Sequence, residues 1–343
     1  MAKSDGNALE RLREALRSGQ VARLYIFHGE EAYLRRFYLD ELKKALVPEG
    51  FEEFNYHRME GKGLAVQALS DAVEAMPMMA EHTLVVVQDL DLYKLDERSR
   101  SQMIELLSDL PEYCTLVFSY EQLPFKRDAK MRKLNEVLDR AEVVEFARQE
   151  RAALLRWIKK RFAATGHDID SSAADHLLFT CGSLMSQLIP EIEKIGAYAK
   201  GQNVTVADIN AVADPVLDAR IFDMTNCITA GKYDDAARVL GELLRMQTEP
   251  IAILAAVGKE LRRLYTARLA LDDGKDRLWL KQIWGMSSDY PAKLLLQAAR
   301  RVDGAWCRRA VKRCQTLDRR MKSERGVDAE AELKQFVMEL AQR

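Results

Sequence analysis

The sequence has few cysteines, no long apolar run and almost no net charge, and each of these absences excludes a class of protein. No stretch approaches the roughly 20 apolar residues that cross a bilayer, and the first residues lack the apolar segment of a secretion signal. We therefore expect a cytoplasmic protein with no membrane partner. The five cysteines are scattered and have no CxxC spacing, which argues against a zinc site or a disulfide framework and is typical of reduced thiols in the cytoplasm: Cys114, Cys181, Cys227, Cys307 and Cys314.

Charge is balanced over the chain but not locally. The formal net charge of -1 excludes binding to nucleic acid by bulk charge alone. The segment 259–325 nevertheless holds 18 Lys or Arg against 8 Asp or Glu, and it is densest in RRVDGAWCRRAVKRCQTLDRRMK. This basic face beside Trp306 could follow a phosphate backbone, or it could be a solvated helix surface or an interface to acidic neighbours.

The first part of the chain alternates between predicted strands and predicted helices. Arg23–Leu46 reads as a buried strand (23–28), a turn at Gly29 and an amphipathic helix (31–46). Further strands are predicted at 53–58, 84–87, 115–120 and 142–146, and helices at 63–75, 97–109 and 128–139. This alternation over about 145 residues predicts an α/β module with a parallel sheet.

A strand, a glycine and a helix open many nucleotide-binding domains, but the phosphate-binding residues are absent here. If Gly29 is the first glycine of GxxxxGK[ST], the last three positions fall on Leu34, Arg35 and Arg36. Leucine replaces the glycine that lets the backbone approach phosphate, and the two arginines replace the lysine and the magnesium-binding hydroxyl. Acidic residues at the helix start would also repel an incoming phosphate. We interpret the module as an NTPase-like scaffold that does not bind nucleotide.

No other motif predicts a catalytic or metal site. Asp89 and Asp91 follow the apolar strand in VVVQDLD, where an acid holds magnesium in phosphate-loop enzymes; alternatively, both cap or solvate the loop. GxSxG, HExxH and Cys/His clusters are absent, and we interpret the isolated histidines as surface or core residues: His28, His57, His82, His167 and His176.

After residue 149 the pattern becomes helical. Short helices at 151–164, 171–179 and 184–199, with a fragment at 205–212, predict a small bundle that ends at Asp214-Pro215. Thr205 is a suitable N-cap, and Pro250 suits a first helical turn. The remainder, from 218 to 341, predicts a third domain of helix pairs.

Three methionines surround a proline between the helix at 63–75 and the strand at 84–87. Proline ends the helix, so Met76, Pro77, Met78 and Met79 should form a loop near the sheet edge. Methionine is common on surfaces that fit into a partner's pocket, but it also fills gaps in cores. Composition leaves both interpretations open.

The chain resembles a known family over nearly its whole length. RLYIFHGEEAYLRRFYLDELKKAL, PMMAEHTLVVVQDL and LVFSYEQLPFKRDAKMRKL are similar to the N-terminal domain of the delta subunit of the bacterial DNA polymerase III clamp loader. EPIAILAAVGKELRRLYTARLAL, LLQAARRV and LDRRMKS are similar to its C-terminal domain.

The resemblance implies three domains and no ATP hydrolysis. These would be an AAA+-like α/β clamp-binding domain without a phosphate loop (1–147), an all-α lid (148–213) and an all-α collar for oligomerisation (214–343). We expect no catalytic site, cofactor or metal, although the DNA polymerase III holoenzyme containing such a subunit is a DNA-directed DNA polymerase.

The resemblance also implies partners and a binding site. Delta subunits bind the beta sliding clamp and open one of its interfaces during DNA replication, using an apolar pair before the third strand. The matching positions are Met78 and Met79, preceded by Pro77, where the family often has leucine and phenylalanine. The collar would bind other loader subunits, and primed DNA would join the assembled complex.

Two alternatives belong to other classes of function. One is a DNA-stimulated AAA+ ATPase with a degenerate phosphate loop, and the other is a protein that binds DNA alone through its basic C-terminal face. The order and identity of neighbouring subunits, the effect of methionine on clamp affinity, and the partner of residues 300–325 (DNA or protein) stay open.

Overall fold

The computed structural model describes residues 5–324 and 326–341, which form two compact units. The first unit runs to Gln149 and includes the short segment Leu184–Ser186; the second comprises Glu150–Ser183 and the chain from Gln187 onward. The predicted lid–collar boundary at 213/214 lies inside the second unit and stays a prediction.

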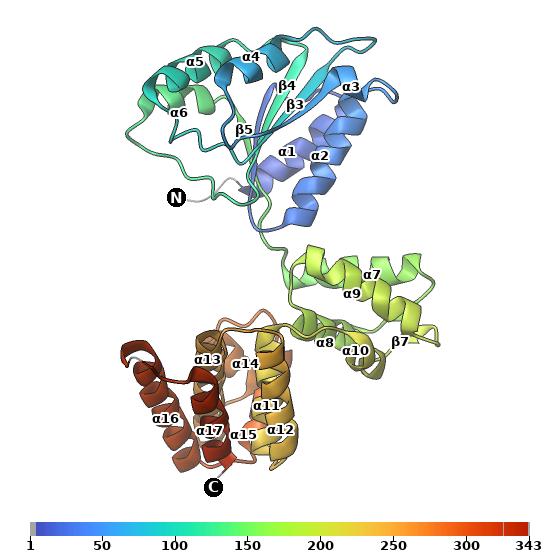
Figure 1. Cartoon of the computed structure of the whole chain (residues 1–343). Helices are drawn as coiled ribbons and strands as arrows, with labels where there is room; N and C mark the ends of the chain where they lie inside the picture. The colour runs from blue at the N-terminus through green and yellow to red at the C-terminus, as the bar shows by residue number, and fades with distance from the viewer. Residues whose placement is uncertain (1–4, 325, 342–343) are drawn as a thin grey trace. The chain divides into compact units, whose positions relative to one another are not determined.

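The first unit is an α/β module built on a five-stranded sheet (Figure 1). Its helices are α1 (Asp5–Ser18), α2 (Ala32–Leu46), α3 (Glu52–Asn55), α4 (Val66–Glu74), α5 (Glu97–Ser108) and α6 (Arg132–Leu138). Its strands are β1 (Leu24–His28), β2 (Tyr56–Glu60), β3 (Thr83–Gln88), β4 (Cys114–Ser119) and β5 (Glu142–Glu145).

All strands of this sheet are parallel, as the sequence predicted, and their order is β2-β3-β4-β1-β5. Helices cover both faces (Figure 1): α4, α5 and α6 lie on one, and α1 and α2 on the other. Alternate residues of β3 enter the two cores, with Val85 and Val87 facing α4–α6 and Leu84 and Val86 facing α1–α2. The continuous apolar run therefore reflects a strand buried on both faces.

The second unit is mainly helical. Its first helices are α7 (Arg151–Ala164), α8 (Ser171–Cys181), α9 (Met185–Tyr198) and α10 (Val206–Val212), with two-residue strands β6 (Asp168–Ile169) and β7 (Asn203–Val204) that pair in parallel. The helices that follow are α11 (Leu217–Thr229), α12 (Tyr233–Arg245), α13 (Pro250–Asp272), α14 (Arg277–Ile283), α15 (Tyr290–Ala299), α16 (Gly304–Ser323) and α17 (Ala329–Ala341). Long apolar stripes on α13 and its neighbours form their core.

Local chemistry accounts for several of these boundaries. Thr205 and Asp208 form a capping box at α10, and Pro250 occupies the first turn of α13, as predicted. Two features were not predicted: residues 52–55 form α3, so that β2 begins at Tyr56 rather than 53, and β6 and β7 pair. Among the described helices, none is long and apolar enough to cross a membrane.

Candidate functional site

The loop after β1 begins at Gly29, and its backbone is tied to the segment after β5. The φ angle of Gly29 is +116°, and a Cβ atom there would lie 2.5 Å from the carbonyl oxygen of Phe146, so only glycine fits. Phe146 donates its N–H to the carbonyl of His28 at 2.7 Å and accepts the N–H of Glu31 at 2.9 Å. A phosphate-binding loop needs N–H groups that face the anion. The N–H of Glu31 is instead bonded within the protein.

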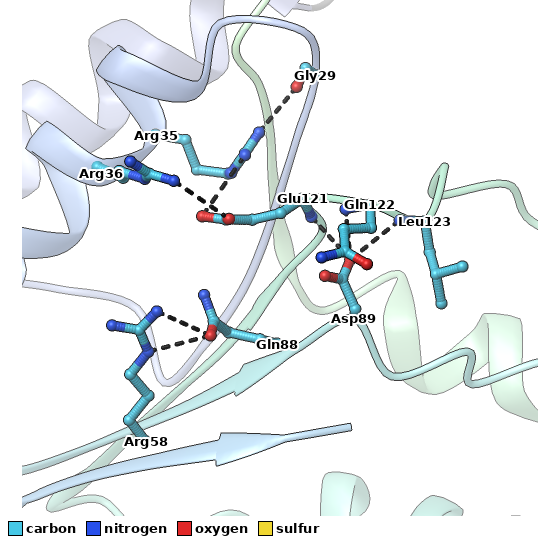
Figure 2. A network of polar contacts seen from close by, with 9 residues as sticks. All are labelled: Gly29, Arg35, Arg36, Arg58, Gln88, Asp89, Glu121, Gln122 and Leu123. Carbon is cyan, nitrogen blue, oxygen red and sulfur yellow. Dashed lines mark hydrogen bonds and ion pairs between the residues drawn. The ribbon is translucent and has the colours of Figure 1, made fainter. Parts of the chain in front are cut away.

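Arg35 of α2 closes this loop from the other side, as Figure 2 shows. Its residue surface is only 2% exposed, and its Nη1 donates to the carbonyl of Gly29 at 2.8 Å. Its Nη2 lies 3.7 Å from a carboxylate oxygen of Glu121, whose other oxygen lies 3.5 Å from Nη2 of Arg36. Burial lowers the pKa of Arg35, and the charge of Glu121 opposes this shift. The arginine that replaces the phosphate-loop lysine therefore binds the loop itself.

Asp89 caps the turn after β4. Its Oδ1 accepts the backbone N–H groups of Glu121 at 2.8 Å, Gln122 at 2.9 Å and Leu123 at 3.1 Å (Figure 2). Asp91 accepts the N–H two residues further on at 3.2 Å and pairs with the lysine three residues on at 3.0 Å. Asp91 therefore caps the loop after its own strand, as one interpretation predicted, whereas Asp89 caps the turn after the neighbouring strand β4. Over residues 5–324 and 326–341, no three His, Cys, Asp or Glu side chains gather as a metal site requires.

Arg58 and Gln88 extend the polar contacts at the same edge of the sheet. The guanidinium of Arg58 donates to Oε1 of Gln88 through Nε at 3.1 Å and through Nη2 at 2.8 Å, which joins β2 to β3 (Figure 2). The carboxyl edge of a parallel sheet is where α/β domains bind nucleotides. In this chain the edge carries charged side chains that bind one another and the backbone.

The loop between α4 and β3 has the opposite character. Helix α4 ends at Glu74, before Pro77, and the side chains of Met76, Met78 and Met79 are 77%, 47% and 78% exposed. The interpretation that these methionines fill a gap in their own core is therefore wrong. Met79 has a φ angle of +52°, in the left-handed region that residues other than glycine rarely adopt. The loop offers apolar side chains on a backbone of unusual shape.

Two side chains hold the backbone of this loop. Asn55, fully buried at the end of α3, accepts the N–H of Met78 at 2.8 Å and donates to its carbonyl, also at 2.8 Å. Tyr113 donates its hydroxyl to the carbonyl of Glu74 at 3.0 Å, where α4 ends. Asn55 precedes β2, Tyr113 precedes β4, and both strands flank β3. Asn55 was not predicted, because an asparagine before a strand carries no signal of a partner 23 residues away.

The basic segment near the C-terminus is partly used within the second unit. Trp306 is buried, and its indole N–H donates to the carbonyl of Leu340 at 3.2 Å, so it is not part of an exposed basic face. Arg320 of α16 forms two hydrogen bonds, of 2.9 and 3.1 Å, to the carboxylate of Glu332 on α17. Some of the arginines therefore join helices to one another.

Most of the cysteines are buried, and His176 is hydrogen-bonded through both ring nitrogens. Burial raises the pKa of Cys114 to about 11, which keeps this thiol protonated and unreactive. Cys181, Cys307 and Cys314 are also buried, and all five cysteines are free. His176 bonds through one ring nitrogen to the hydroxyl of Tyr290 at 2.9 Å and through the other to Oδ1 of Asn210 at 2.6 Å.

Comparison with known families fits both units. The model of the DNA polymerase III delta subunit matches residues 25–147, and the model of that subunit's C-terminal domain matches residues 218–340. Together they cover well over half of the chain. The chain belongs to the DNA polymerase III delta subunit family. The resemblance inferred from the sequence is thus confirmed, and the chain is a clamp-loader protein of DNA replication.

Relatives of the delta family resemble the chain at low identity but over much of its length. It is 23% identical to DNA polymerase III subunit delta of Bacillus subtilis over 339 residues, 96% of each chain. It is 22% identical to a probable DNA polymerase III subunit delta of Aquifex aeolicus, over 74% of this chain and 73% of the relative. The solved DNA clamp loader delta protein of Bacillus subtilis has the same fold, with a TM-score of 0.50 and 20% identity over 98% of this chain and 100% of that one.

Proposed function

We propose that the chain binds the beta sliding clamp through Met78 and Met79 and favours opening of one clamp interface, without hydrolysing ATP itself. Membership in the delta family supports the clamp as partner. The observation that carries the proposal is the exposure of Met76, Met78 and Met79 on a loop whose backbone is fixed by buried groups. Large apolar side chains at a partner surface commonly provide most of the binding free energy.

Binding would act on the clamp by population shift. A ligand favours the open form of a ring only by the difference between its affinities for the open and closed forms. Met78 and Met79 would enter an apolar pocket on the clamp whose shape accompanies the open interface. Pro77 would direct the pair outward, because its ring fixes φ and holds Met76 in an extended conformation.

The remaining parts of the chain would serve assembly. Residues 1–147 would form the clamp-binding domain, 148–213 the lid, and 214–343 the collar that joins other loader subunits in the cytoplasm. Primed DNA would contact the assembled complex. The contact of Arg35 with the carbonyl of Gly29 supports a subunit without catalysis, because the arginine at the position of the phosphate-loop lysine is bonded to its own loop instead of facing a phosphate.

The double variant Met78→Ala with Met79→Ala tests this proposal and should cause the largest loss of clamp affinity. We expect it to keep the wild-type melting temperature but to weaken clamp binding by about 2–4 kcal/mol, roughly 30- to 1000-fold. Isothermal titration calorimetry of the full chain against the beta clamp measures the change.

The matched control replaces two methionines of the second unit, Met246→Ala with Met338→Ala. These side chains are 62% and 69% exposed, so the control removes a similar apolar area elsewhere. The control should bind the clamp as the wild type does. Wild-type affinity of the Met78/Met79 variant would disprove the proposed site.

A further inference from the structure

The Asn55 side chain bonds only to backbone atoms of the loop that carries Met76, Met78 and Met79. Its carboxamide accepts the N–H of Met78 and donates to the carbonyl of the same residue, both at 2.8 Å, as a neighbouring strand would. The same amide nitrogen lies 3.2 Å from the carbonyl of Phe51, which ties the side chain back to its own helix. Asn55 is fully buried, so water does not compete for these hydrogen bonds.

The loop needs this support because its own sequence does not specify its shape. Met79 adopts a φ angle of +52°, yet the segment Met76–His82 contains no glycine that would favour the left-handed region. Pro77 restricts the backbone on one side of Met78, and Asn55 fixes Met78 itself. The unusual conformation of Met79 begins directly after these two restraints.

We propose that Asn55 is a positioning residue that pre-organises Met78 and Met79 for docking on the clamp, an inference that rests on the proposed function. Methionine side chains are flexible, and a partner must order them and the loop that carries them when it binds. A backbone already fixed in the free protein reduces this cost and thus strengthens binding. Asn55 does this without touching the partner, because it is buried.

The chemistry of the contact specifies asparagine. A carboxamide presents one acceptor and one donor side by side, which matches the carbonyl and N–H of a single residue. Aspartate has the same size but only acceptors, so its carboxylate would face the carbonyls of Met78 and Phe51 without a hydrogen. Alanine removes both hydrogen bonds. The variants Asn55→Asp and Asn55→Ala therefore separate the donor from the rest of the side chain.

The first measurement uses the free full-length chain. Hydrogen exchange should show that the amide of Met78 is protected in the wild type, because its N–H donates to a buried oxygen. Asn55→Ala should lose that protection, whereas Asn55→Asp should keep much of it through its carboxylate. Rapid exchange of this amide in the folded wild type would overturn the proposal without any reference to the clamp.

The second measurement is calorimetric titration of the same chains with the beta clamp. We expect Asn55→Ala and Asn55→Asp to bind about tenfold more weakly, because the loop must be ordered on binding. In the Met78→Ala, Met79→Ala background, Asn55→Ala should cause no further loss, since its effect passes through those side chains. A purely structural role would weaken binding equally in both backgrounds and would overturn the proposal.

The matched control is Asn135→Ala. The Asn135 side chain also joins separate segments of the first unit, since it donates to the carbonyl of Asp128 at 2.8 Å and accepts the hydroxyl of Tyr93 at 2.7 Å. This variant should lose a similar amount of thermal stability but bind the clamp normally. If Asn55→Ala binds normally while the methionine variant does not, the role of Asn55 is wrong and the proposed function stands. If the methionine variant binds normally, the proposed function fails and this inference fails with it.

Discussion

The two edges of the parallel sheet treat their loops in opposite ways. At the carboxyl edge, the charged side chain of Arg35 is 3% exposed and bonded to the loop after β1. At the amino edge, the apolar side chain of Met79 is 78% exposed, while the loop before β3 is held by a buried asparagine. The usual burial of apolar groups and exposure of charges is inverted at both places. At one edge a buried charged group is bonded to its own loop, and at the other apolar residues lie exposed on a loop whose backbone is fixed.

A substitution at Gly29 should have the largest effect on the stability of the carboxyl edge. Gly29→Ala should lower the free energy of unfolding by about 3 kcal/mol, because a side chain would meet the carbonyl of Phe146 and would also be strained at positive φ. Urea denaturation measures the loss. Gly50→Ala is the control, since Gly50 has a φ of +86° but no heavy atom within 4 Å of an added Cβ. This control should lose only about 1 kcal/mol. An equal loss at both positions would show that the backbone of Phe146 does not crowd position 29.

Variants of Arg35 measure how much its guanidinium stabilises the loop after β1. Arg35→Met should destabilise the chain by about 2 kcal/mol, because the carbonyl of Gly29 and the carboxylate of Glu121 lose a partner. Arg36→Met should change stability by less than about 0.5 kcal/mol, since that side chain is 69% exposed.

Equilibrium dialysis with labelled ATP extends this comparison to ligand binding. Neither wild type nor Arg35→Met should bind ATP at micromolar concentration, because Leu34 still replaces the glycine that phosphate needs. Micromolar binding by the wild type would favour the ATPase alternative.

Asp89 distinguishes a cap from a magnesium ligand. Asp89→Ala should cost about 1–2 kcal/mol, because three backbone N–H groups lose their acceptor. Asp89→Asn should cost less, since asparagine keeps an acceptor and tolerates the φ of +52° at this position. Magnesium chloride should leave the melting temperature of the wild type unchanged. A rise that depends on Asp89 would contradict the capping role.

Met79 gives the smallest expected effect on stability. Met79→Gly should change the free energy of unfolding by less than about 0.5 kcal/mol, because relief of the left-handed backbone offsets the greater freedom of the unfolded glycine. Met79→Ala keeps the strain and should be no more stable than Met79→Gly. Both variants should weaken clamp binding, so that stability and affinity change independently at this edge. A large destabilisation by Met79→Ala would mean that the side chain supports its own domain.

Much of the carboxyl edge could be predicted from the sequence because its residues stand in a short, recognisable order. The strand, Gly29 and the helix are contiguous, so the absence of a phosphate-binding glycine at Leu34 was visible without a structure. The continuous apolar run before Asp89 likewise predicted a strand buried on both faces. These features depend on local spacing, which the sequence states directly.

The amino edge could be predicted only in part. Composition showed an apolar loop at Met78 and Met79 but could not decide whether these side chains were buried, because methionine is common in both settings. Asn55 could not be found, since it bonds to main-chain atoms that every residue possesses. The helix that carries it, Glu52–Asn55, is too short for an apolar period, and the paired two-residue strands at 168–169 and 203–204 are likewise too short for one.

Asn55 bonds only to main-chain atoms of Met78. The conformation of this loop therefore does not depend on which side chains stand at positions 78 and 79. Other large apolar residues could replace the methionines at 78 and 79 without altering the hydrogen bonds that fix the loop backbone. A change in the clamp's pocket could then be matched by one or two substitutions at positions 78 and 79, with the rest of the domain unchanged.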